Sequence, residues 1–292
     1  MKSDKTFLVA GGDLRQAFVA GHLAREYTVY ALGFDNDVEL DDRVVPIESV
    51  CELGGPPDYI VFPIPASNDS EHVNMPLSHK HTRLQDVLEA ASPDTVIFAG
   101  KAGKSLAAMC HLQGLELIDY MEREELAVLN AVPTAEGAIQ IAMEEMPTTL
   151  YGQKCLITGF GRISKALIRA LSGLGMEVSV SARKYGDLAW IQVYGCKAVP
   201  IRELPGVVGQ YDLVLNTVPA MLFDRSVLRA MKKGSLLIDL ASKPGGVDFT
   251  MAKELGVKAI WALSLPGKVA PVTAGEIICN TIRNMIQERG SE

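Results

Sequence analysis

The chain has 292 residues, of which 48% are hydrophobic and 22% are charged. A chain of this length predicts about two domains of roughly 150 residues, each with its own buried core. Lys and Arg number 28 and Asp and Glu number 35, which gives a formal net charge of −7. This balance excludes the basic surface of a typical nucleic-acid-binding protein, although a local group of cations can still bind an anionic ligand.

The sequence gives no indication of a membrane segment or a metal site. The longest apolar stretches, such as Leu126–Val132 and Gly234–Leu240, are far shorter than the ~20 residues that cross a bilayer. We expect no secretory signal either. The five cysteines form no CxxC pair, and His79 and His81 have no further partners at metal-binding spacing. We therefore expect a cytoplasmic protein without a bound metal.

Short β-rich runs alternate with helical runs along the chain, a pattern typical of α/β proteins with parallel sheets. We expect helices in most of the intervals, including Leu126–Met146 and Thr273–Glu288. The ten predicted strands are Thr6–Ala10, Thr28–Leu32, Tyr59–Phe62, Thr95–Ala99, Leu115–Asp119, Cys155–Thr158, Glu177–Ser181, Leu213–Asn216, Ser235–Asp239 and Lys258–Trp261.

One pattern occurs twice, in residues 6–35 and 154–183. Each copy contains a strand, a Gly-rich turn, a helix and a second strand, followed by a charged residue. This repeat predicts two Rossmann-like, doubly wound α/β domains with a cleft between them. In both copies 24 positions separate the first glycine from the charged residue, from Gly11 to Asp35 and from Gly159 to Arg183.

The second copy has the features of a dinucleotide-binding turn. Gly159 permits the sharp turn, and Gly161 lets the backbone approach a pyrophosphate. The following helix directs its first N–H groups at that phosphate, and Ser164 stands where a third Gly or Ala is usual. The residues predicted to bind the cofactor here are Gly159, Phe160, Gly161, Arg162 and Ile163.

The end of the next strand favours NADP as the cofactor and leaves NAD open. An NAD site usually has an acidic residue there, which binds the ribose 2′-hydroxyl. This chain instead has Ser181, Arg183 and Lys184, which suit a 2′-phosphate but also suit a solvated strand end. Further cofactor-binding residues are expected at the ends of two later strands, namely Thr217, Val218, Pro219, Ala241 and Ser242.

The first copy has a different turn, and Asp13 is the reason. Its carboxylate would repel a pyrophosphate, so we do not expect a dinucleotide there. Two interpretations stay open: Asp13 lies at a helix N-terminus, which the helix dipole favours, or the turn binds the substrate. In the second case the substrate-binding residues are Gly12, Asp13, Arg15 and Gln16.

Six segments resemble the family of the dipicolinate synthase A-subunit, and together they extend over nearly the whole chain. They are VAGGDLRQ (9–16), NAVPTAEGAI (130–139), ITGFGRISKALIRAL (157–171), NTVPAML (216–222), IDLASKPGGVDF (238–249) and LPGKVAPVTAGEII (265–278). The resemblance implies NAD(P)-dependent aromatisation of a dihydrodipicolinate-type intermediate of the lysine pathway to pyridine-2,6-dicarboxylate. It also implies a flavoprotein partner, the dipicolinate synthase B-subunit, and a place in the mother cell of a sporulating bacterium.

Two alternative functions stay open. The layout also resembles D-2-hydroxyacid dehydrogenases, but that family has an Arg and a His where this chain has Ala241-Ser242-Lys243 and Pro266-Gly267-Lys268. Without the His, a keto acid has no obvious acid catalyst. The chain could also be a nucleotide-binding scaffold that activates its partner without turnover of its own.

Two segments carry candidate catalytic residues. Thr134 and Glu136 stand at the start of a predicted helix, where Thr134 is either the N-cap or a ligand and Glu136 is a candidate base. Lys268 lies in a predicted rigid loop, Leu265–Pro271, and could bind a substrate carboxylate. Further substrate-binding candidates are Ser67, in a loop or lid, and Lys101 and Lys243, which could equally be solvated cations.

We place the domain boundary near residue 148. Residues 1–148 should form the substrate domain and residues 149–270 the NAD(P)-binding domain. The last helix, within 273–292, should return to the first domain by analogy with the hydroxyacid dehydrogenase architecture. We also expect a symmetric homo-oligomer, since most such folds form one.

Overall fold

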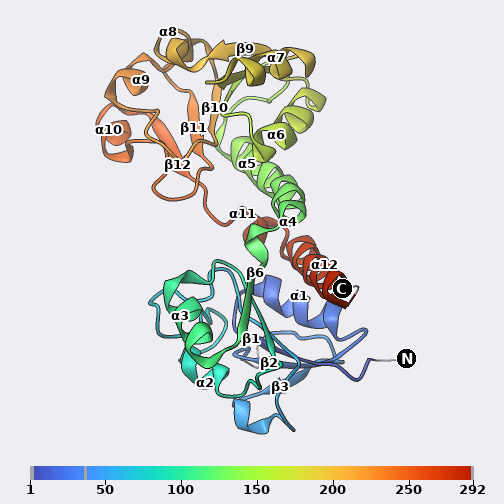
Figure 1. Ribbon diagram of the computed structural model, residues 1–292. Helices are drawn as coiled ribbons and strands as arrows, with labels where there is room; N and C mark the ends of the chain where they lie inside the picture. The colour runs from blue at the N-terminus through green and yellow to red at the C-terminus, as the bar shows by residue number, and fades with distance from the viewer. Residues whose placement is uncertain (1–2, 36–37, 291–292) are drawn as a thin grey trace. The chain divides into compact units, whose positions relative to one another are not determined.

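The computed structural model describes residues 3–35 and 38–290 and divides into two compact units. Unit 1 comprises residues 1–129 and 270–292, and unit 2 comprises residues 130–269. Each unit contains a six-stranded parallel sheet with helices on both faces (Figure 1). The predicted α/β class, with two doubly wound Rossmann-like domains, is therefore confirmed.

The sheet of unit 1 has the strand order β3-β2-β1-β4-β5-β6. The order reverses between β1 and β4, and in open α/β sheets ligands bind beyond the strand ends at such a switch point. Its strands are β1 (Thr6–Ala10), β2 (Thr28–Leu32), β3 (Val45–Ile47), β4 (Tyr59–Val61), β5 (Val96–Ala99) and β6 (Glu116–Asp119).

Both faces of this sheet are covered by helices, and successive side chains of β1 point into two different cores. Phe7 and Val9 belong to the core under α1 and α12, whereas Leu8 and Ala10 belong to the core under α2 and α3. A strand that is buried on both faces has a continuous run of apolar residues, as β1 has in its sequence TFLVA. The helices are α1 (Leu14–Leu23), α2 (Leu84–Leu88), α3 (Gly103–Gln113), α4 (Glu124–Leu129) and α12 (Pro271–Gly290), with short 3₁₀ turns at Val50–Glu52 and Tyr120–Glu122.

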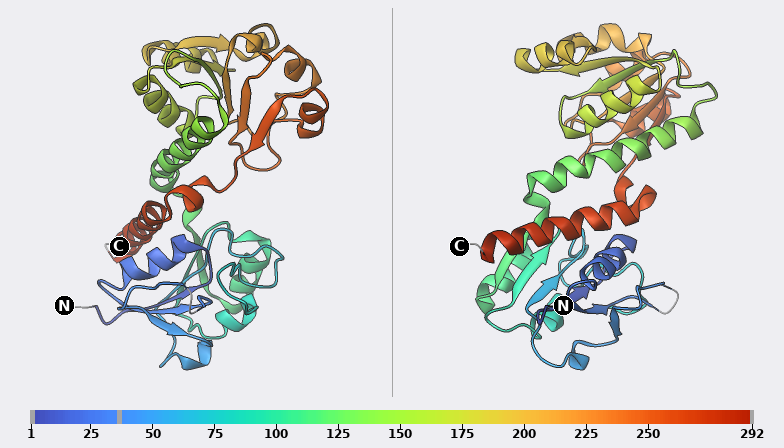
Figure 2. Two further views of the ribbon diagram at one scale, coloured as in Figure 1. Left: turned by 180° about the vertical axis from the view of Figure 1, so that it is seen from behind. Right: turned by 90° about the vertical axis from the view of Figure 1, so that its right-hand side faces the viewer.

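The C-terminal helix α12 packs along α1 in unit 1, as both views of Figure 2 show. Gly275 lies where the two helices meet. A Cβ atom on Gly275 would lie 2.7 Å from the carbonyl oxygen of Arg15 and 2.7 Å from Cβ of Phe18. The close approach of α1 and α12 therefore depends on a residue without a side chain.

Unit 2 repeats the same topology, with the strand order β12-β11-β10-β7-β8-β9. Its switch point lies between β7 and β10, the counterparts of β1 and β4. The strands are β7 (Lys154–Thr158), β8 (Glu177–Ala182), β9 (Lys197–Pro200), β10 (Leu213–Asn216), β11 (Leu236–Asp239) and β12 (Lys258–Trp261).

The strands of unit 2 also contribute to two cores. Cys155 and Ile157 of β7 pack with α5 and α6, whereas Leu156 packs on the opposite face with α8, α9 and α10. The helices are α5 (Ala131–Glu145), α6 (Arg162–Gly173), α7 (Tyr185–Val193), α8 (Leu204–Val207), α9 (Arg225–Ala230), α10 (Phe249–Glu254) and α11 (Leu265–Val269), with short 3₁₀ turns at Ile201–Glu203 and Val208–Gln210.

All ten predicted strands are present, each within one residue of its predicted ends. Two strands were not predicted, β3 and β9. Both lie at sheet edges, both are short, and each contains a proline, Pro46 or Pro200. Proline is found at sheet edges because it lacks a donor for the hydrogen-bond ladder, and it weakens the sequence signal for a strand. The predicted C-terminal helix extends to residue 292, which lies outside the described residues.

The division between the units differs from the predicted boundary at residue 148. It falls at residues 129 and 130, so that the whole of α5 belongs to unit 2. Ala135, Ala138 and Ala142 of α5 are buried in the core with β7 and α6, which explains the assignment. The sequence suggested the later boundary because Pro147 marks only the end of this helix.

One helical stretch, Glu124–Glu145, is long and apolar enough to cross a membrane by length and composition. The sequence prediction missed it because no single apolar run in it is long. It comprises α4 and α5, its most apolar window has a mean hydropathy of 1.3, and 44% of that window is buried within the structure. The packing of α5 in the core of unit 2 accounts for its apolar composition.

Replacing Gly275 with Ala should destabilise unit 1, because the new methyl group overlaps the α1 backbone. Overpacking of this kind costs about 1–3 kcal/mol. Urea unfolding monitored by circular dichroism measures the change. Gly290→Ala in the same helix is the matched control, since a Cβ there meets nothing within 4 Å. Equal stability of the two variants would contradict the packing argument.

Candidate functional site

The turn between β7 and α6 has the shape of a phosphate-binding loop. Gly159 has a φ of +92°, and a Cβ on it would lie 2.5 Å from Oγ1 of Thr217. Both facts restrict this position to glycine. Gly161 differs, because its φ is −95° and no atom lies within 4 Å of the place of its Cβ. The space beside Gly161 is therefore open, as the approach of a pyrophosphate requires.

Helix α6 begins without a side-chain cap. Gly161 is its N-cap residue, and glycine has no side chain that could accept a hydrogen bond from the first N–H groups of the helix. The first N–H groups of a helix need an acceptor, and together with the helix dipole they favour an anion. The open space at Gly161 and the uncapped helix fit a dinucleotide phosphate.

A cavity of about 360 Å³ lies at the carboxyl ends of β8 and β9. Ser181 is fully buried, and within the described residues its Oγ atom has no hydrogen-bond partner. The predicted cofactor residues meet here: the cavity is lined by Gly159, Phe160, Ser181, Arg183, Lys184 and Val218, together with Ala182, Asp187, Ile201, Ala220 and Leu222.

The other predicted cofactor residues lie around this turn without lining the cavity. Thr217 donates its hydroxyl to the carbonyl of Thr158 (2.7 Å) and lies 3.0 Å from Oγ of Ser164, so it holds the turn in place. Pro219 follows on the same segment, Arg162 and Ile163 begin α6, and Ala241 and Ser242 follow β11. Their role in cofactor binding stays a prediction.

A buried polar network fixes these strand ends, and the sequence reasoning missed it. Oγ1 of Thr158 donates to Oδ1 of Asn216 (2.6 Å), and Nδ2 of Asn216 donates to Oδ1 of Asp239 (2.8 Å). Asp239 also accepts the backbone N–H groups of Ala241 (3.1 Å) and Gly246 (2.8 Å). All three side chains are fully buried. The sequence did contain a signal for this network, because each of the three apolar strands ends in a polar residue.

The corresponding turn of unit 1 is closed by its own side chains. Asp13 is the N-cap of α1 and accepts the N–H of Arg15 at 3.0 Å, so its position at a helix N-terminus is confirmed, while substrate binding by this turn stays a prediction. The carboxylate also accepts Nε (2.9 Å) and Nη2 (2.8 Å) of the Arg15 guanidinium. Asp13 thus caps a helix and holds a cation, and its carboxylate stands where a phosphate would otherwise accept the first N–H groups.

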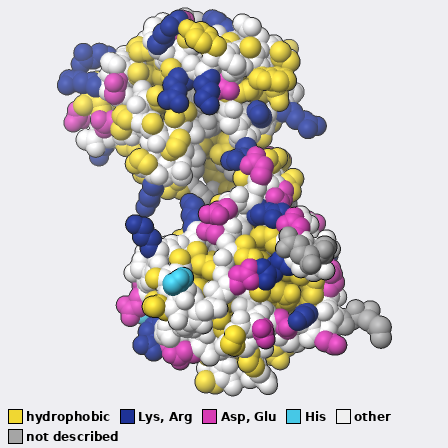
Figure 3. All heavy atoms as spheres, in the orientation of Figure 1, with side chains coloured by type: hydrophobic (Ala, Val, Ile, Leu, Met, Phe, Trp, Pro, Cys, Tyr) yellow, Lys and Arg dark blue, Asp and Glu magenta, His cyan; other side chains and the backbone are white. Residues whose placement is uncertain are grey.

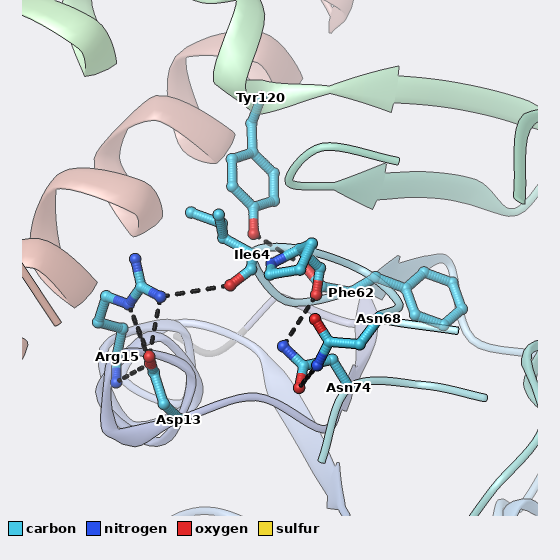
Figure 4. Close-up of polar contacts among 8 residues, drawn as sticks. Asp13, Arg15, Phe62, Ile64, Asn68, Asn74 and Tyr120 are labelled. Atoms are coloured by element: carbon cyan, nitrogen blue, oxygen red, sulfur yellow. Dashed lines mark hydrogen bonds and ion pairs between the residues drawn. The ribbon is translucent and has the colours of Figure 1, made fainter. Parts of the chain in front are cut away.

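The segment that follows β4 is held by three side chains from three different elements (Figure 4). Tyr120 donates its hydroxyl to the carbonyl of Phe62 (2.9 Å). Nη2 of Arg15 donates to the carbonyl of Ile64 (3.3 Å), and Nδ2 of Asn74 donates to the carbonyl of Pro65 (3.1 Å). The Ile64–Pro65 peptide bond is cis. This segment lies at the β1/β4 switch point of unit 1.

Residues 73–79 contact the glycine turn and the end of β2 in unit 1, where a dinucleotide would lie, and a cavity of about 750 Å³ remains beside them. The N–H of Gly12 donates to the carbonyl of Asn74 (2.8 Å), and side-chain or backbone atoms of residues 73–75 lie within 2.9 Å of the place of a Gly11 Cβ. Asp35, at the ribose position, accepts the hydroxyl of Ser78 (2.7 Å) and the N–H of His79 (2.8 Å). These hydrogen bonds lower the pKa of Asp35.

The segment of residues 66–82 is a loop, one of the two forms expected of it, and its role as a lid stays a prediction. Buried Val73 and Met75 anchor it. The hydroxyl of Ser67 is used within it, because it donates to Asp69 (3.1 Å) and accepts the N–H of Ser70 (2.9 Å). Ser67 thus shapes the loop.

The predicted substrate cations take different positions. Lys101 follows β5, is exposed and has a φ of +51°, which is uncommon for a residue with a side chain. Its N–H donates to Oδ1 of Asp119 (3.2 Å). Lys243 is exposed in the loop after β11. Their role in substrate binding stays a prediction.

Thr134, Glu136 and Lys268 all belong to unit 2. Helix α5 begins at Ala131, so the prediction that Thr134 is its N-cap is wrong; Thr134 donates instead to the carbonyl of Asn130 (2.7 Å). The helix can begin earlier because Pro133 falls in the first turn, where its missing N–H is not needed. Glu136 is exposed.

Lys268 lies in helix α11, and the prediction of a rigid loop at 265–271 is wrong. Pro266 is tolerated in the first turn of this helix. Helix α11 packs on α5 at Gly137, where a Cβ would lie 3.1 Å from Cβ of Leu265. The three candidate catalytic residues are thus carried by two packed helices, and Lys268 is exposed.

The charge of the chain is unevenly divided between the units. Residues 130–269 carry 16 Lys and Arg against 11 Asp and Glu, whereas the rest of the chain carries 12 against 24. On the face drawn in Figure 3, Asp and Glu are more frequent over unit 1 than over unit 2. The net charge of −7 therefore conceals a cationic unit 2, which suits an anionic cofactor.

Two protein-family models match this chain, one in its N-terminal part and one in its C-terminal part. Residues 6–121 match the family described as the N-terminal domain of the dipicolinate synthase A-subunit, and residues 126–245 match the NAD-binding domain of D-isomer specific 2-hydroxyacid dehydrogenases. The chain is 32% identical to the dipicolinate synthase A-subunit of Bacillus subtilis (strain 168), over 97% of this chain and 96% of that protein.

Solved structures agree with this similarity. The crystal structure of the dipicolinate synthase A-subunit from Bacillus halodurans has a TM-score of 0.90 and 30% identity, and the match covers 98% of each chain. A transhydrogenase from Sinorhizobium meliloti has a TM-score of 0.70 at 15% identity, over 98% of this chain and 94% of that one, and so shares the fold.

Two glycine substitutions should separate cofactor binding from folding. Gly161→Ala should fold normally, because its φ is ordinary and its Cβ meets no protein atom, yet it should weaken NAD(P)H binding about 10- to 100-fold. Gly159→Ala should lose stability by about 1–3 kcal/mol, because it combines strain with overlap on Thr217. Fluorescence titration and thermal unfolding measure the two effects. Unchanged NAD(P)H affinity in Gly161→Ala would contradict the assignment.

Proposed function

Because the chain belongs to the family of the dipicolinate synthase A-subunit, we propose that it oxidises a dihydrodipicolinate-type cyclic dicarboxylate to pyridine-2,6-dicarboxylate with NAD(P)⁺. The observation that carries the proposal is the similarity to this family over 97% of the chain. The open glycine turn of unit 2 supports the use of a dinucleotide, because Gly161 leaves room for a pyrophosphate.

The proposed reaction removes two hydrogens from the ring. One ring C–H bond is lost as a hydride, the ring N–H bond is lost as a proton, and the electron pair of the N–H bond stays on the nitrogen as its lone pair. A bound nicotinamide supplies the hydride acceptor. We propose Glu136 as the base that accepts the proton, since it is exposed and forms no hydrogen bond within the described residues. Thr134 is proposed to position the substrate.

The substrate carries two carboxylates, and we propose that cations bind them. Arg15 is the strongest candidate, because its guanidinium is held in one orientation by Asp13 and Ile64. A fixed guanidinium binds a carboxylate without a further loss of side-chain freedom. The proposed ligands for the second carboxylate are Lys101, Lys243 and Lys268, each of which is at least partly exposed.

We propose NADP as the preferred cofactor. Arg183 and Lys184 line the cavity at the end of β8, where a 2′-phosphate of the adenosine ribose would lie. The buried hydroxyl of Ser181, which has no partner within the described residues, offers a further hydrogen bond. Asp187 also lines the cavity and opposes a phosphate, but the two cations outweigh one carboxylate.

We further propose that the chain works with the flavoprotein B-subunit of dipicolinate synthase in the mother cell of a sporulating bacterium, as a homo-oligomer. The support for these proposals is the family. A flavoprotein partner is also required by the scaffold alternative, in which this chain binds the dinucleotide and its partner carries out the oxidation.

A second candidate is oxidation of a 2-hydroxy acid, favoured by the match of residues 126–245 to that NAD-binding domain. The stretches 241–243 and 266–268 oppose it, because they contain neither the Arg nor the His that this family has there. Lysine ammonium groups ordinarily hold their proton too tightly near neutral pH to donate it to a carbonyl.

Turnover should be measured with the purified chain, freshly prepared dihydrodipicolinate and NADP⁺, by the absorbance of the reduced nicotinamide. We expect reduction that depends on both reactants, and a large loss of rate in Glu136→Gln. Turnover only after addition of the flavoprotein B-subunit would favour the scaffold alternative. Reduction with 2-hydroxy acids alone would contradict the proposed substrate.

The cofactor preference can be tested with Arg183→Ala. This change should weaken NADPH binding about 10- to 100-fold, through loss of a charge-assisted hydrogen bond, and should change NADH binding little. Lys253→Ala is the control, since α10 packs on β12 at the opposite edge of the sheet. Tighter binding of NADH than of NADPH by the unchanged protein would refute the preference.

A further inference from the structure

The side chain of Gln16 is buried without a hydrogen-bond partner. The residue is 2% exposed, and within the described residues neither Nε2 nor Oε1 forms a hydrogen bond. An unpaired buried amide costs about 1–3 kcal/mol, so such groups normally have a partner. The amide offers both a donor and an acceptor, and neither is used by the chain.

Gln16 lies at the switch point of unit 1, next to the segment that follows β4. A Cβ on Gly12 would lie 2.1 Å from Cγ of Gln16 and 2.9 Å from Cβ of Pro63, so the Gln16 side chain lies close to both residues. The neighbouring residue Arg15 bonds the carbonyl of Ile64. Arg15 and Gln16 therefore lie beside Ile64 and Pro63, two consecutive residues of the segment that follows β4.

Arg15 also has unused donors. Its side chain is 9% exposed, and Nε and Nη2 are engaged by Asp13 and Ile64. Nη1 has no partner in the part of the chain that the structure describes, and Figure 4 shows it directed away from both acceptors. The guanidinium is thus fixed on one edge and available on the other, an arrangement suited to a carboxylate.

The two residues together define the chemistry of a ligand. Nη1 of Arg15 and Nε2 of Gln16 are donors and match a carboxylate, which only accepts hydrogen bonds. Oε1 of Gln16 needs a donor, which a carboxylate lacks. We propose that Arg15 and Gln16 bind a carboxylate together with an N–H or O–H group on the adjacent atom, as in a cyclic imino or amino acid or a 2-hydroxy acid.

This inference rests on the proposed function and deepens it, because it distinguishes the reduced ring from the aromatic product. A dihydropyridine precursor with a ring N–H carries this donor beside its carboxylate. The nitrogen of pyridine-2,6-dicarboxylate carries only a lone pair, which would face the lone pairs of Oε1. Binding should therefore weaken on aromatisation, and this difference favours product release. Asp13 serves as a positioning residue for Arg15.

Calorimetric titration of the full chain with two probes tests the proposal. We expect piperidine-2,6-dicarboxylate, which has ring N–H donors, to bind about tenfold more tightly than pyridine-2,6-dicarboxylate, the ratio that one net hydrogen bond gives. Gln16→Met should bring this ratio close to one. Arg15→Lys should weaken both probes by a similar factor. Gln113→Met, which removes an exposed amide on α3, should behave like the unchanged protein.

Thermal unfolding supplies a second, independent readout. Gln16→Met should unfold at a higher temperature than the unchanged protein, because a side chain of similar size replaces an unpaired buried amide. A clearly lower temperature would show that the amide already has a partner, such as an ordered water, and would overturn the proposal. A ratio that Gln16→Met leaves unchanged would overturn it too, while the proposed oxidation would still stand on the turnover assay.

Discussion

The helix that follows the first strand of a nucleotide-type fold begins with N–H groups that need an acceptor, and the two units of this protein supply it differently. In unit 1 the carboxylate of Asp13 caps α1, and the carbonyl of Asn74 accepts the N–H of Gly12. In unit 2 no side chain caps α6, and the space beside Gly161 is open. One topology thus gives one closed turn and one turn ready for an anion.

The same contrast extends to the end of the second strand. In unit 1 the acidic residue Asp35 is present, but Ser78 and His79 occupy its carboxylate. In a nucleotide-binding domain the ribose hydroxyl donates to this carboxylate, whereas here Ser78 and His79 of the chain itself donate to it. In unit 2 the equivalent position is Arg183, beside a cavity of about 360 Å³. The two units therefore share a topology but differ at the glycine turn, which is open in unit 2 and covered by residues 73–75 in unit 1, although a cavity of about 750 Å³ also lies beside Asp35.

Buried polar groups distinguish the parts of the protein that are complete from those that need a ligand. The Thr158–Asn216–Asp239 network is fully paired, and it holds the strand ends of unit 2 in place. Ser181 and Gln16 are buried and lack partners within the described residues. An unpaired buried group is costly, so a ligand or an ordered water that pairs with either residue would stabilise the protein. Each of these residues lies beside a strand end at which ligands of such folds bind.

The sequence alone was sufficient for the fold class, the ten principal strands and the position of the dinucleotide turn. These features follow from local patterns: apolar runs of strand length, and glycines at positions that require them. It also placed Asp13 at a helix N-terminus as one of two alternatives, and Asp13 does cap α1. The short edge strands β3 and β9 were missed, because Pro46 and Pro200 weaken their local signal.

Only the tertiary structure decided how these turns are completed. The partner of Gly12 is Asn74, the partners of Asp35 are Ser78 and His79, and α5 begins at Ala131 within unit 2. The unpaired state of Gln16 is likewise visible only in three dimensions. Whether a polar group is paired depends on residues far away in the chain, and a local sequence pattern does not show which distant residues will lie beside it. The sequence therefore determined which chemical groups this protein carries, and the packing determined which of them remain available to a ligand.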